Sequence, residues 1–115
     1  NILQNAKDAL IEKNITTKKV FVSIKKDKEF AYVNILDNAG GISQNVIDKI
    51  FEPYFTTKIN RKASGLGLFI SKIIIEENMQ GKLEFENANE GAKFIIKIPI
   101  LEEIKWMKIK IFSDI

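Results

Sequence analysis

Apolar residues recur at helical spacing at the start of the chain. At about 100° per residue they share one arc of a helical wheel: Ile2, Leu3, Ala6, Ala9 and Leu10. Polar side chains fall on a separate line of the same segment: Asn1, Asn5, Asp8 and Glu12. The pattern predicts an amphipathic helix from Asn1 to about Lys13 that carries a polar stripe.

Two further helical patterns follow in the middle of the chain. Ser43 is suited to cap a short helix that begins at Gln44, and Pro53 must end it because proline lacks a backbone donor. A longer pattern matches the i, i+3, i+4, i+7, i+8 template: Leu66, Phe69, Ile70, Ile73 and Ile74. Gly81 lies just beyond Met79, where a helix end would be capped. We therefore predict a long second helix that ends near Met79.

The segments between the helices alternate apolar and other residues, as strands do. One pair of alternating runs flanks a charged turn over 26–29: Val20, Val22 and Ile24, then Ala31, Val33 and Ile35. A second pair flanks a turn over 87–91: Leu83 and Phe85, then Phe94, Ile96 and Ile98. The patterns predict two antiparallel hairpins and an α+β fold, with helices over one face of the sheet.

Composition limits the chemistry that the chain can carry. Its 115 residues are enough for one domain with a core of its own. It has no cysteine, which excludes disulfides and thiolate metal sites, and no apolar run long enough to span a bilayer. Lys plus Arg is 18 and Asp plus Glu is 15, and the net charge of +3 neither requires nor excludes an anionic partner.

Four short boxes follow one another along these elements. The first, Asn1-Ile2-Leu3-Gln4-Asn5-Ala6, opens the first helix, and the second, Asp37-Asn38-Ala39-Gly40-Gly41-Ile42, follows a strand. The third is Phe51-Glu52-Pro53-Tyr54-Phe55, and the fourth, Gly65-Leu66-Gly67-Leu68, opens the long helix. Exposed N–H groups and the dipole at a helix start bind anions, so the fourth box suits phosphate. Position 70 is Ile and no Gly-Lys-Ser/Thr follows, which excludes a Rossmann fingerprint and a Walker loop.

In order and in kind, these boxes resemble the N, G1, F and G2 boxes of the ATP-binding catalytic domain of bacterial sensor histidine kinases. The superfamily also includes type II topoisomerases and chaperone ATPases. The resemblance covers residues 1–100 and implies a two-layer Bergerat-type α+β sandwich, with a mixed, mostly antiparallel sheet covered on one face by helices. It also implies that the upstream part of the domain is missing, and that 101–115 is a C-terminal extension of unknown role.

The resemblance assigns roles to individual residues. Asn5 is the implied Mg²⁺ ligand, and an amide oxygen suits a hard cation that keeps phosphate oxygens and water in its shell. Asn1, one turn earlier, would support the phosphates or their water. Asp37 would accept a hydrogen bond from the exocyclic amine of adenine, and Gly41 would let the backbone lie close to the ring. Guanine presents a carbonyl oxygen instead, so ATP is expected rather than GTP.

A polar and basic segment lies between the third and fourth boxes. Lys58, Arg61 and Lys62 suit a lid that closes over the triphosphate and neutralises its charge, while the aromatic residues of the third box are expected to pack. The implied catalytic residues are Asn1, Asn5 and Lys58. Besides Asn5, Asp37 and Gly41, the implied nucleotide contacts are Ile42, Phe51, Thr57, Lys58, Gly65, Leu66, Gly67 and Leu68.

The leading hypothesis is a protein histidine kinase of the two-component type, of which this chain is the catalytic ATP-binding portion. It would bind Mg-ATP and donate the γ-phosphate to a histidine on a separate dimerisation domain, because the chain itself contains no histidine. The expected partners are the dimerisation and phosphotransfer helices of the parent kinase and, indirectly, a response regulator, with no nucleic acid. A cytoplasmic location is expected, whether or not the parent protein is anchored in a membrane.

Three alternatives stay open. An ATPase of the same superfamily would use a glutamate general base at position 1, where Asn1 cannot take a proton. Intact Asn5, Asp37, Gly65 and Gly67 argue against an interaction module that has lost its nucleotide. A serine-directed kinase of the anti-sigma-factor type differs in its acceptor, and only the sequence upstream of the first box would separate it from a histidine kinase.

Overall fold

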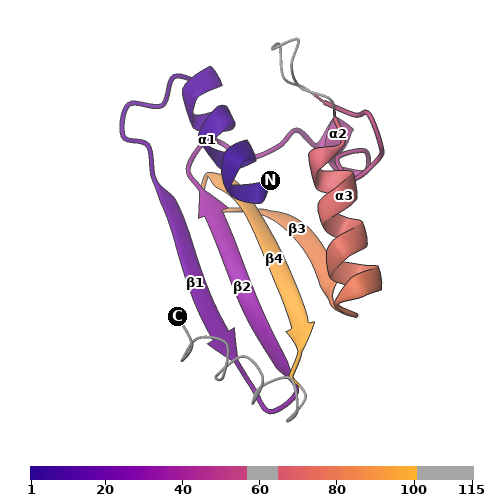
Figure 1. Ribbon diagram of the computed structural model, residues 1–115. Helices are drawn as coiled ribbons and strands as arrows, with labels where there is room; N and C mark the ends of the chain where they lie inside the picture. Colours follow the sequence, from indigo (N-terminus) through magenta and orange to yellow (C-terminus); the bar gives the residue numbers. More distant parts are fainter. Residues whose placement is uncertain (57–64, 101–115) are drawn as a thin grey trace, which may run out of the picture.

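The computed structural model describes residues 1–56 and 65–100, which form the fold drawn in Figure 1. The expected lid residues Thr57, Lys58, Arg61 and Lys62, and the extension 101–115, lie outside the described residues. The helices are α1 (Ile2–Glu12), α2 (Gln44–Ile47), α3 (Gly67–Ile73) and the π-helical η1 (Ile74–Asn78), and the strands are β1 (Val20–Lys26), β2 (Phe30–Asp37), β3 (Lys82–Ala88) and β4 (Gly91–Pro99).

Both predicted hairpins are confirmed. β1 pairs with β2 around a turn that Asp27 holds, since its Oδ1 accepts hydrogen bonds from the backbone N–H groups of Phe30 (2.7 Å) and Glu29 (2.8 Å). These bonds, that from Phe30 most strongly, keep the pKa of Asp27 below its ordinary value. β3 pairs with β4 around Asn89 and Glu90, both at positive φ, so the turn is shorter than the predicted 87–91.

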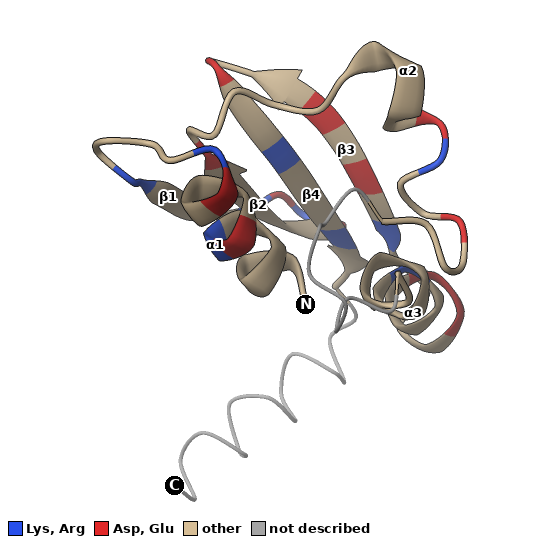
Figure 2. Ribbon diagram, turned by 90° about the horizontal axis from the view of Figure 1, so that it is seen from above, with Lys and Arg blue, Asp and Glu red and all other residues tan. Residues whose placement is uncertain are grey.

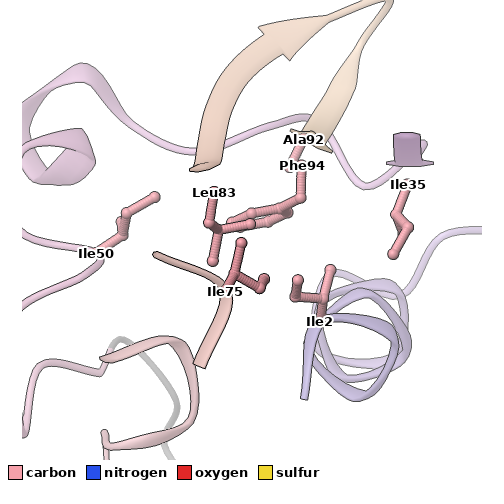
Figure 3. Close-up of a cluster of buried hydrophobic side chains, with 7 residues drawn as sticks. All are labelled: Ile2, Ile35, Ile50, Ile75, Leu83, Ala92 and Phe94. Carbon is pink, nitrogen blue, oxygen red and sulfur yellow. The ribbon is translucent and has the colours of Figure 1, made fainter. Parts of the chain in front are cut away.

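The described strands form one sheet in the order β1-β2-β4-β3, and every pairing is antiparallel rather than mixed. α1 and α3 lie on the same face of this sheet (Figures 1 and 2). The side chains between the layers form one core cluster (Figure 3): Ile2, Ile35, Ile50, Ile75, Leu83, Ala92 and Phe94. The predicted α+β fold with helices over one face of the sheet is therefore confirmed.

The first helix buries one residue per turn, Ile2, Ala6 and Leu10, as the apolar arc predicts. Ser43 caps α2 as expected, because its hydroxyl accepts a hydrogen bond from the backbone N–H of Asn45 (3.4 Å). The predicted long helix is α3 continued by η1, and its last five residues are π-helical. No helix in the described part of the chain is long and apolar enough to cross a membrane.

Glu76 joins the long helix to the sheet. Its Oε2 accepts hydrogen bonds from Lys72 Nζ (2.9 Å) and from the backbone N–H of Leu83 on β3 (3.1 Å). Lys72 Nζ also donates to the Leu83 carbonyl (3.3 Å). The hydrogen bond from Lys72, followed by that from Leu83, holds the pKa of Glu76 below its ordinary value against the opposing effect of burial.

The edge strand β1 departs from the simple expectation of a half-buried strand. Val22 and Ile24 lie opposite Ile35 and Val33 of β2 and so share the face of the sheet that carries the helices. They are nevertheless 55% and 74% exposed, because α1 packs over β2 and no described element covers β1. Alternation shows which side chains share a face, and it carries no information about what lies over that face.

Candidate nucleotide-binding site

A cavity of about 550 Å³ lies against the polar side of α1, and all four boxes contribute to its wall. This volume is within the usual range for sites that bind small molecules. The first box contributes Asn1, Gln4, Asn5 and Ala6, the second Asp37, Ala39, Gly41 and Ile42, the third Phe55, and the fourth Gly65, Gly67 and Leu68. Segments far apart in the sequence therefore meet at one site.

Asp37 lines one part of the cavity, which we call its base end. It is 4% exposed, and among the described residues it is the only charged one that is buried. Its Oδ1 accepts hydrogen bonds from the backbone N–H groups of Ala39 (3.0 Å) and Ala92 (3.2 Å). Among the described residues, no donor lies within hydrogen-bond distance of Oδ2. Every fully buried side-chain nitrogen or oxygen of these residues has a hydrogen-bond partner, so Oδ2 is not fully buried. Since Asp37 lines the cavity, Oδ2 opens on it.

The loop after Asp37 passes close to the β3–β4 hairpin. The backbone N–H of Gly40 donates to the Glu90 carbonyl (2.7 Å), and a Cβ on Gly91 would overlap the Asp37 carbonyl oxygen. Gly41 has φ +81°, and a Cβ there would lie 2.5 Å from Asn87 Oδ1. Gly41 is predicted to let the backbone approach the base, and the structure shows that a glycine is needed here for the close packing of the loop against Asn87 on β3.

Asn1 connects the first and fourth boxes at the other end of the cavity, which we call the phosphate end. Its Nδ2 lies 3.3 Å from both the Gly67 carbonyl and Ser71 Oγ, and Ser71 Oγ in turn donates to the Gly67 carbonyl (2.8 Å). Gly65, at φ +74°, packs on the third box, where a Cβ would overlap the Tyr54 backbone. The first, third and fourth boxes are therefore in direct contact.

The predicted contacts divide into those that line the cavity and those that do not. Among the described residues, the ones that line it are Asn1, Asn5, Asp37, Gly41, Ile42, Gly65, Gly67 and Leu68. Leu66 is the N-cap of α3 and is outside the lining. Phe51 packs edge-on against Phe94 in the core, with ring centroids 6.3 Å apart, and Lys72 Nζ lies 4.7 Å from its centroid. From the third box it is Phe55, followed by Thr56, that reaches the cavity.

Three residues outside the predicted set shape the base end: Lys13, Asn87 and Ala92. Ala92 acts through its backbone, which no side-chain pattern reveals. The sequence predicts a turn over 87–91, and nothing in that pattern indicates a contact between Asn87 and the second box. Lys13 follows the predicted polar stripe directly and is the one of the three for which a positional signal existed.

The metal chemistry open to this cavity is limited. No group of three His, Cys, Asp or Glu side chains in the described residues is arranged to hold an ion. Asn5, on the cavity wall, supplies a neutral oxygen donor. That donor set does not suit an all-protein metal cage, and it fits Mg²⁺, which binds through one or two protein oxygens and completes its shell with phosphate and water.

Comparison with protein families and sequences agrees with this geometry. Residues 1–102 match the family described as histidine kinase-, DNA gyrase B-, and HSP90-like ATPase. The two-component sensor PprA of Pseudomonas aeruginosa is 38% identical over 103 residues, which are 87% of this chain and 11% of that protein. A putative NtrY-like sensor histidine kinase of Rickettsia bellii is 36% identical over 110 residues, 96% of this chain and 17% of that protein.

Solved structures show the same relationship. The nucleotide-free catalytic domain of histidine kinase ThkA superimposes with a TM-score of 0.65 at 30% identity, covering 84% of this chain and 66% of that one. ThkA in complex with the response regulator TrrA gives a TM-score of 0.68 at 31% identity over 90% of this chain and 27% of that one. The predicted resemblance is confirmed: the chain belongs to the family of histidine kinase-, DNA gyrase B- and HSP90-like ATPases, and it resembles the catalytic domains of sensor histidine kinases within it.

Proposed function

We propose that the chain binds Mg-ATP in this cavity and transfers the γ-phosphate to a histidine on a separate dimerisation domain of a two-component sensor kinase. The observation that carries the nucleotide assignment is the divided use of the Asp37 carboxylate. One oxygen is occupied by two backbone donors, and the other opens on the cavity. A buried carboxylate arranged in this way suits a ligand that donates a hydrogen bond.

The free oxygen of Asp37 selects adenine over guanine. The exocyclic amine of adenine donates a hydrogen bond, whereas guanine presents a carbonyl oxygen at the same position. An acceptor opposite a carboxylate leaves a buried charge without a partner, and hydrogen bonds to charged groups contribute about 1.5–3 kcal/mol. This difference supports an ATP site that discriminates against GTP.

The triphosphate fits the phosphate end. Gly67 and Leu68 line the cavity at the first turn of the helix formed by α3 and η1, where the leading N–H groups have no intrahelical partner. The absence of a Cβ at Gly65 allows its close packing on the Tyr54 backbone, and Asn1 donates a hydrogen bond to the Gly67 carbonyl at the same end. Asn5 would hold Mg²⁺, which when bound screens the phosphate charge.

The charged residues of the cavity argue against rapid hydrolysis. Among the described residues that line it, the carboxylates are Asp37, engaged at the base end, and Glu12, the last residue of α1, directly before Lys13. Asn1, at the phosphate end, cannot accept a proton from water. Transfer would occur when an external imidazole nitrogen attacks the γ-phosphorus in line with the bond to the β-phosphate oxygen, which breaks to release ADP.

The chain spans 11% and 17% of the two sensor proteins compared above. We infer that a phosphoacceptor histidine and a response regulator act together with it, as parts outside this sequence. The ThkA–TrrA complex supports a response regulator as the downstream partner. We assign the catalytic domain to residues 1–100, with 101–115 as an extension, and place it in the cytoplasm, where ATP is available.

A phosphotransfer assay tests the proposed function. The chain is incubated with γ-labelled ATP alone and with the histidine-bearing dimerisation helix of its parent protein. We expect no self-labelling, slow hydrolysis, and acid-labile label on the helix only when both parts are present. Rapid hydrolysis by the chain alone would identify an ATPase, and label on a serine of a partner would identify a serine-directed kinase. The Asp37→Asn variant, which retains the Oδ1 acceptor, is the control for nucleotide dependence.

A further inference from the structure

The loop of the second box is fastened from two sides at the base end. On one side Lys13, directly after α1, donates a hydrogen bond from Nζ to the Gly41 carbonyl at 2.7 Å. On the other side the Asn87 amide on β3 meets both backbone groups of Ile42. Asn87 Oδ1 accepts from the Ile42 N–H and Asn87 Nδ2 donates to the Ile42 carbonyl, each at 2.8 Å. Neither residue belongs to the four boxes.

The loop needs such fastening. It contains two successive glycines at positive φ, Gly40 (+89°) and Gly41 (+81°), and glycine loses more conformational freedom on ordering than any other residue. Gly41 and Ile42 both line the cavity, so their position decides whether the backbone lies where a base can pack on it. The Asn87 amide approaches so closely that a side chain at position 41 would collide with it.

The two residues contribute little to the core. Lys13 and Asn87 are both exposed, and neither belongs to the cluster of buried apolar side chains. Their three hydrogen bonds all end on the backbone of Gly41 and Ile42, so they hold the loop and not the core.

We infer that Lys13 and Asn87 are positioning residues for nucleotide binding, which hold Gly41 and Ile42 in the conformation that receives adenine. The inference rests on the proposed function, because it names the supports of the same site. If the loop is ordered before ATP arrives, binding does not have to supply the ordering free energy. Loss of either support should raise the Kd for ATP and the KM, and leave kcat for phosphotransfer unchanged.

The test compares Lys13→Met and Asn87→Ala with matched surface controls. Lys7→Met removes a lysine from the same helix, and Glu84→Ala removes an exposed side chain from the same strand as Asn87. Lys7 and Glu84 make no side-chain hydrogen bond with the described residues. Titration calorimetry with Mg-ATP gives the Kd, and urea unfolding gives the stability of each variant. Lys13→Arg, which keeps a donor, should restore most of the affinity.

From the usual net value of such hydrogen bonds, we expect the Kd to rise about five-fold in Lys13→Met and about ten-fold in Asn87→Ala. Hydrogen exchange of the Ile42 amide should accelerate in Asn87→Ala even without nucleotide, because its acceptor is gone. The controls should match the original chain in all three measurements.

Two results would overturn the inference, and they are distinguishable from each other. If the original chain binds ATP and both variants bind it equally well while only their unfolding free energies fall, the contacts are purely structural. If the original chain does not bind ATP at all, the proposed function fails together with any role of these residues in affinity.

Discussion

The two ends of the cavity are built from different kinds of structure. The base end belongs to the sheet: Asp37 is the last residue of β2, and Ala92 on the neighbouring strand β4 donates to its side chain. The phosphate end lies outside the sheet, where Gly65 packs on the third box and Asn1 reaches Gly67. The base end is thus tied to paired strands, whereas the phosphate end depends on contacts between a helix start and loops.

This contrast predicts different consequences of substitution at the two ends. Changes at Asp37 and Gly91 should alter the fold or the choice of nucleotide, because both residues belong to paired strands. Changes at the phosphate end should alter metal dependence and local packing while the sheet persists. The following experiments measure that difference, from the largest expected effect to the smallest.

Gly91→Ala should be the most damaging substitution. Its Cβ would overlap the Asp37 carbonyl oxygen, and both residues sit in paired strands that cannot move apart without breaking the sheet. We expect the free energy of unfolding to fall by about 3 kcal/mol, measured by urea denaturation. The matched variant at the phosphate end, Gly65→Ala, displaces only loop residues near Tyr54 and should lose about 1 kcal/mol. Equal losses would refute the contrast between the two ends.

Asp37→Asn should retain the fold and lose the choice of base. The new amide keeps an acceptor for Ala39 and Ala92 but replaces the free carboxylate oxygen by a donor, which repels the amine of adenine. We expect ATP affinity to fall about 10–100-fold, with a far smaller ATP preference over GTP. Calorimetry with both nucleotides measures the ratio. Unchanged ATP binding would disprove the assigned base contact.

Asn5→Ala should act on the metal rather than on the base. Asn5 lines the cavity from the polar side of α1, while the buried residues of that helix lie on another face. We expect the enhancement of ATP affinity by Mg²⁺ to fall about ten-fold, with little change in melting temperature. Titrations with and without the metal give this enhancement, and Lys7→Ala on the same helix is the control. Unfolding of the variant, with metal dependence kept in its folded fraction, would show a structural role instead.

Glu76→Gln should give the smallest effect, a loss of about 1 kcal/mol, since it weakens the contact of the phosphate-end helix with Leu83. The pKa of Glu76 is held below its ordinary value of 4.5, so the ionised form stabilises the folded chain above that pH. The contribution is lost as pH falls below 4.5 and through the lower folded value. Urea unfolding on both sides of pH 4.5 should therefore show a shallower pH dependence in the variant than in the original chain. Parallel curves would contradict this role.

The elements were predictable because their signals are local. The arc of Ile2, Ala6 and Leu10 defines α1, and alternation defines all four described strands. The π-helical end of the long helix was not predictable, since the apolar spacing of Ile70, Ile73 and Ile74 suits a regular α-helix equally well. These are limits of periodicity, which records the direction of side chains only.

The site residues were predictable where a side chain of one of the four boxes lines the cavity directly. They were less predictable where the contact depends on a residue far away in the sequence that the fold brings near. Asp37 and Asn5 reach the cavity as expected. Phe51 turns into the core, because its ring packs on Phe94, a residue 43 positions later whose direction no local pattern reports. The contacts of Asn87 with Ile42 and of Ala92 with Asp37 span 45 and 55 positions, and their geometry follows only from the pairing of β2, β4 and β3.

The hydrogen bond from Ala92 to Asp37 also sets an order of events during protein synthesis. Once residue 68 has been added, the growing chain contains all four boxes, yet the base end lacks Ala92, Gly91 and Asn87. The missing strand β4 lies between β2 and β3, so the sheet cannot close without it. Closure over such long sequence separations is slow compared with the formation of a helix. We therefore expect ATP to bind and stabilise a sheet that is already complete, and not to act as a template for the nascent chain.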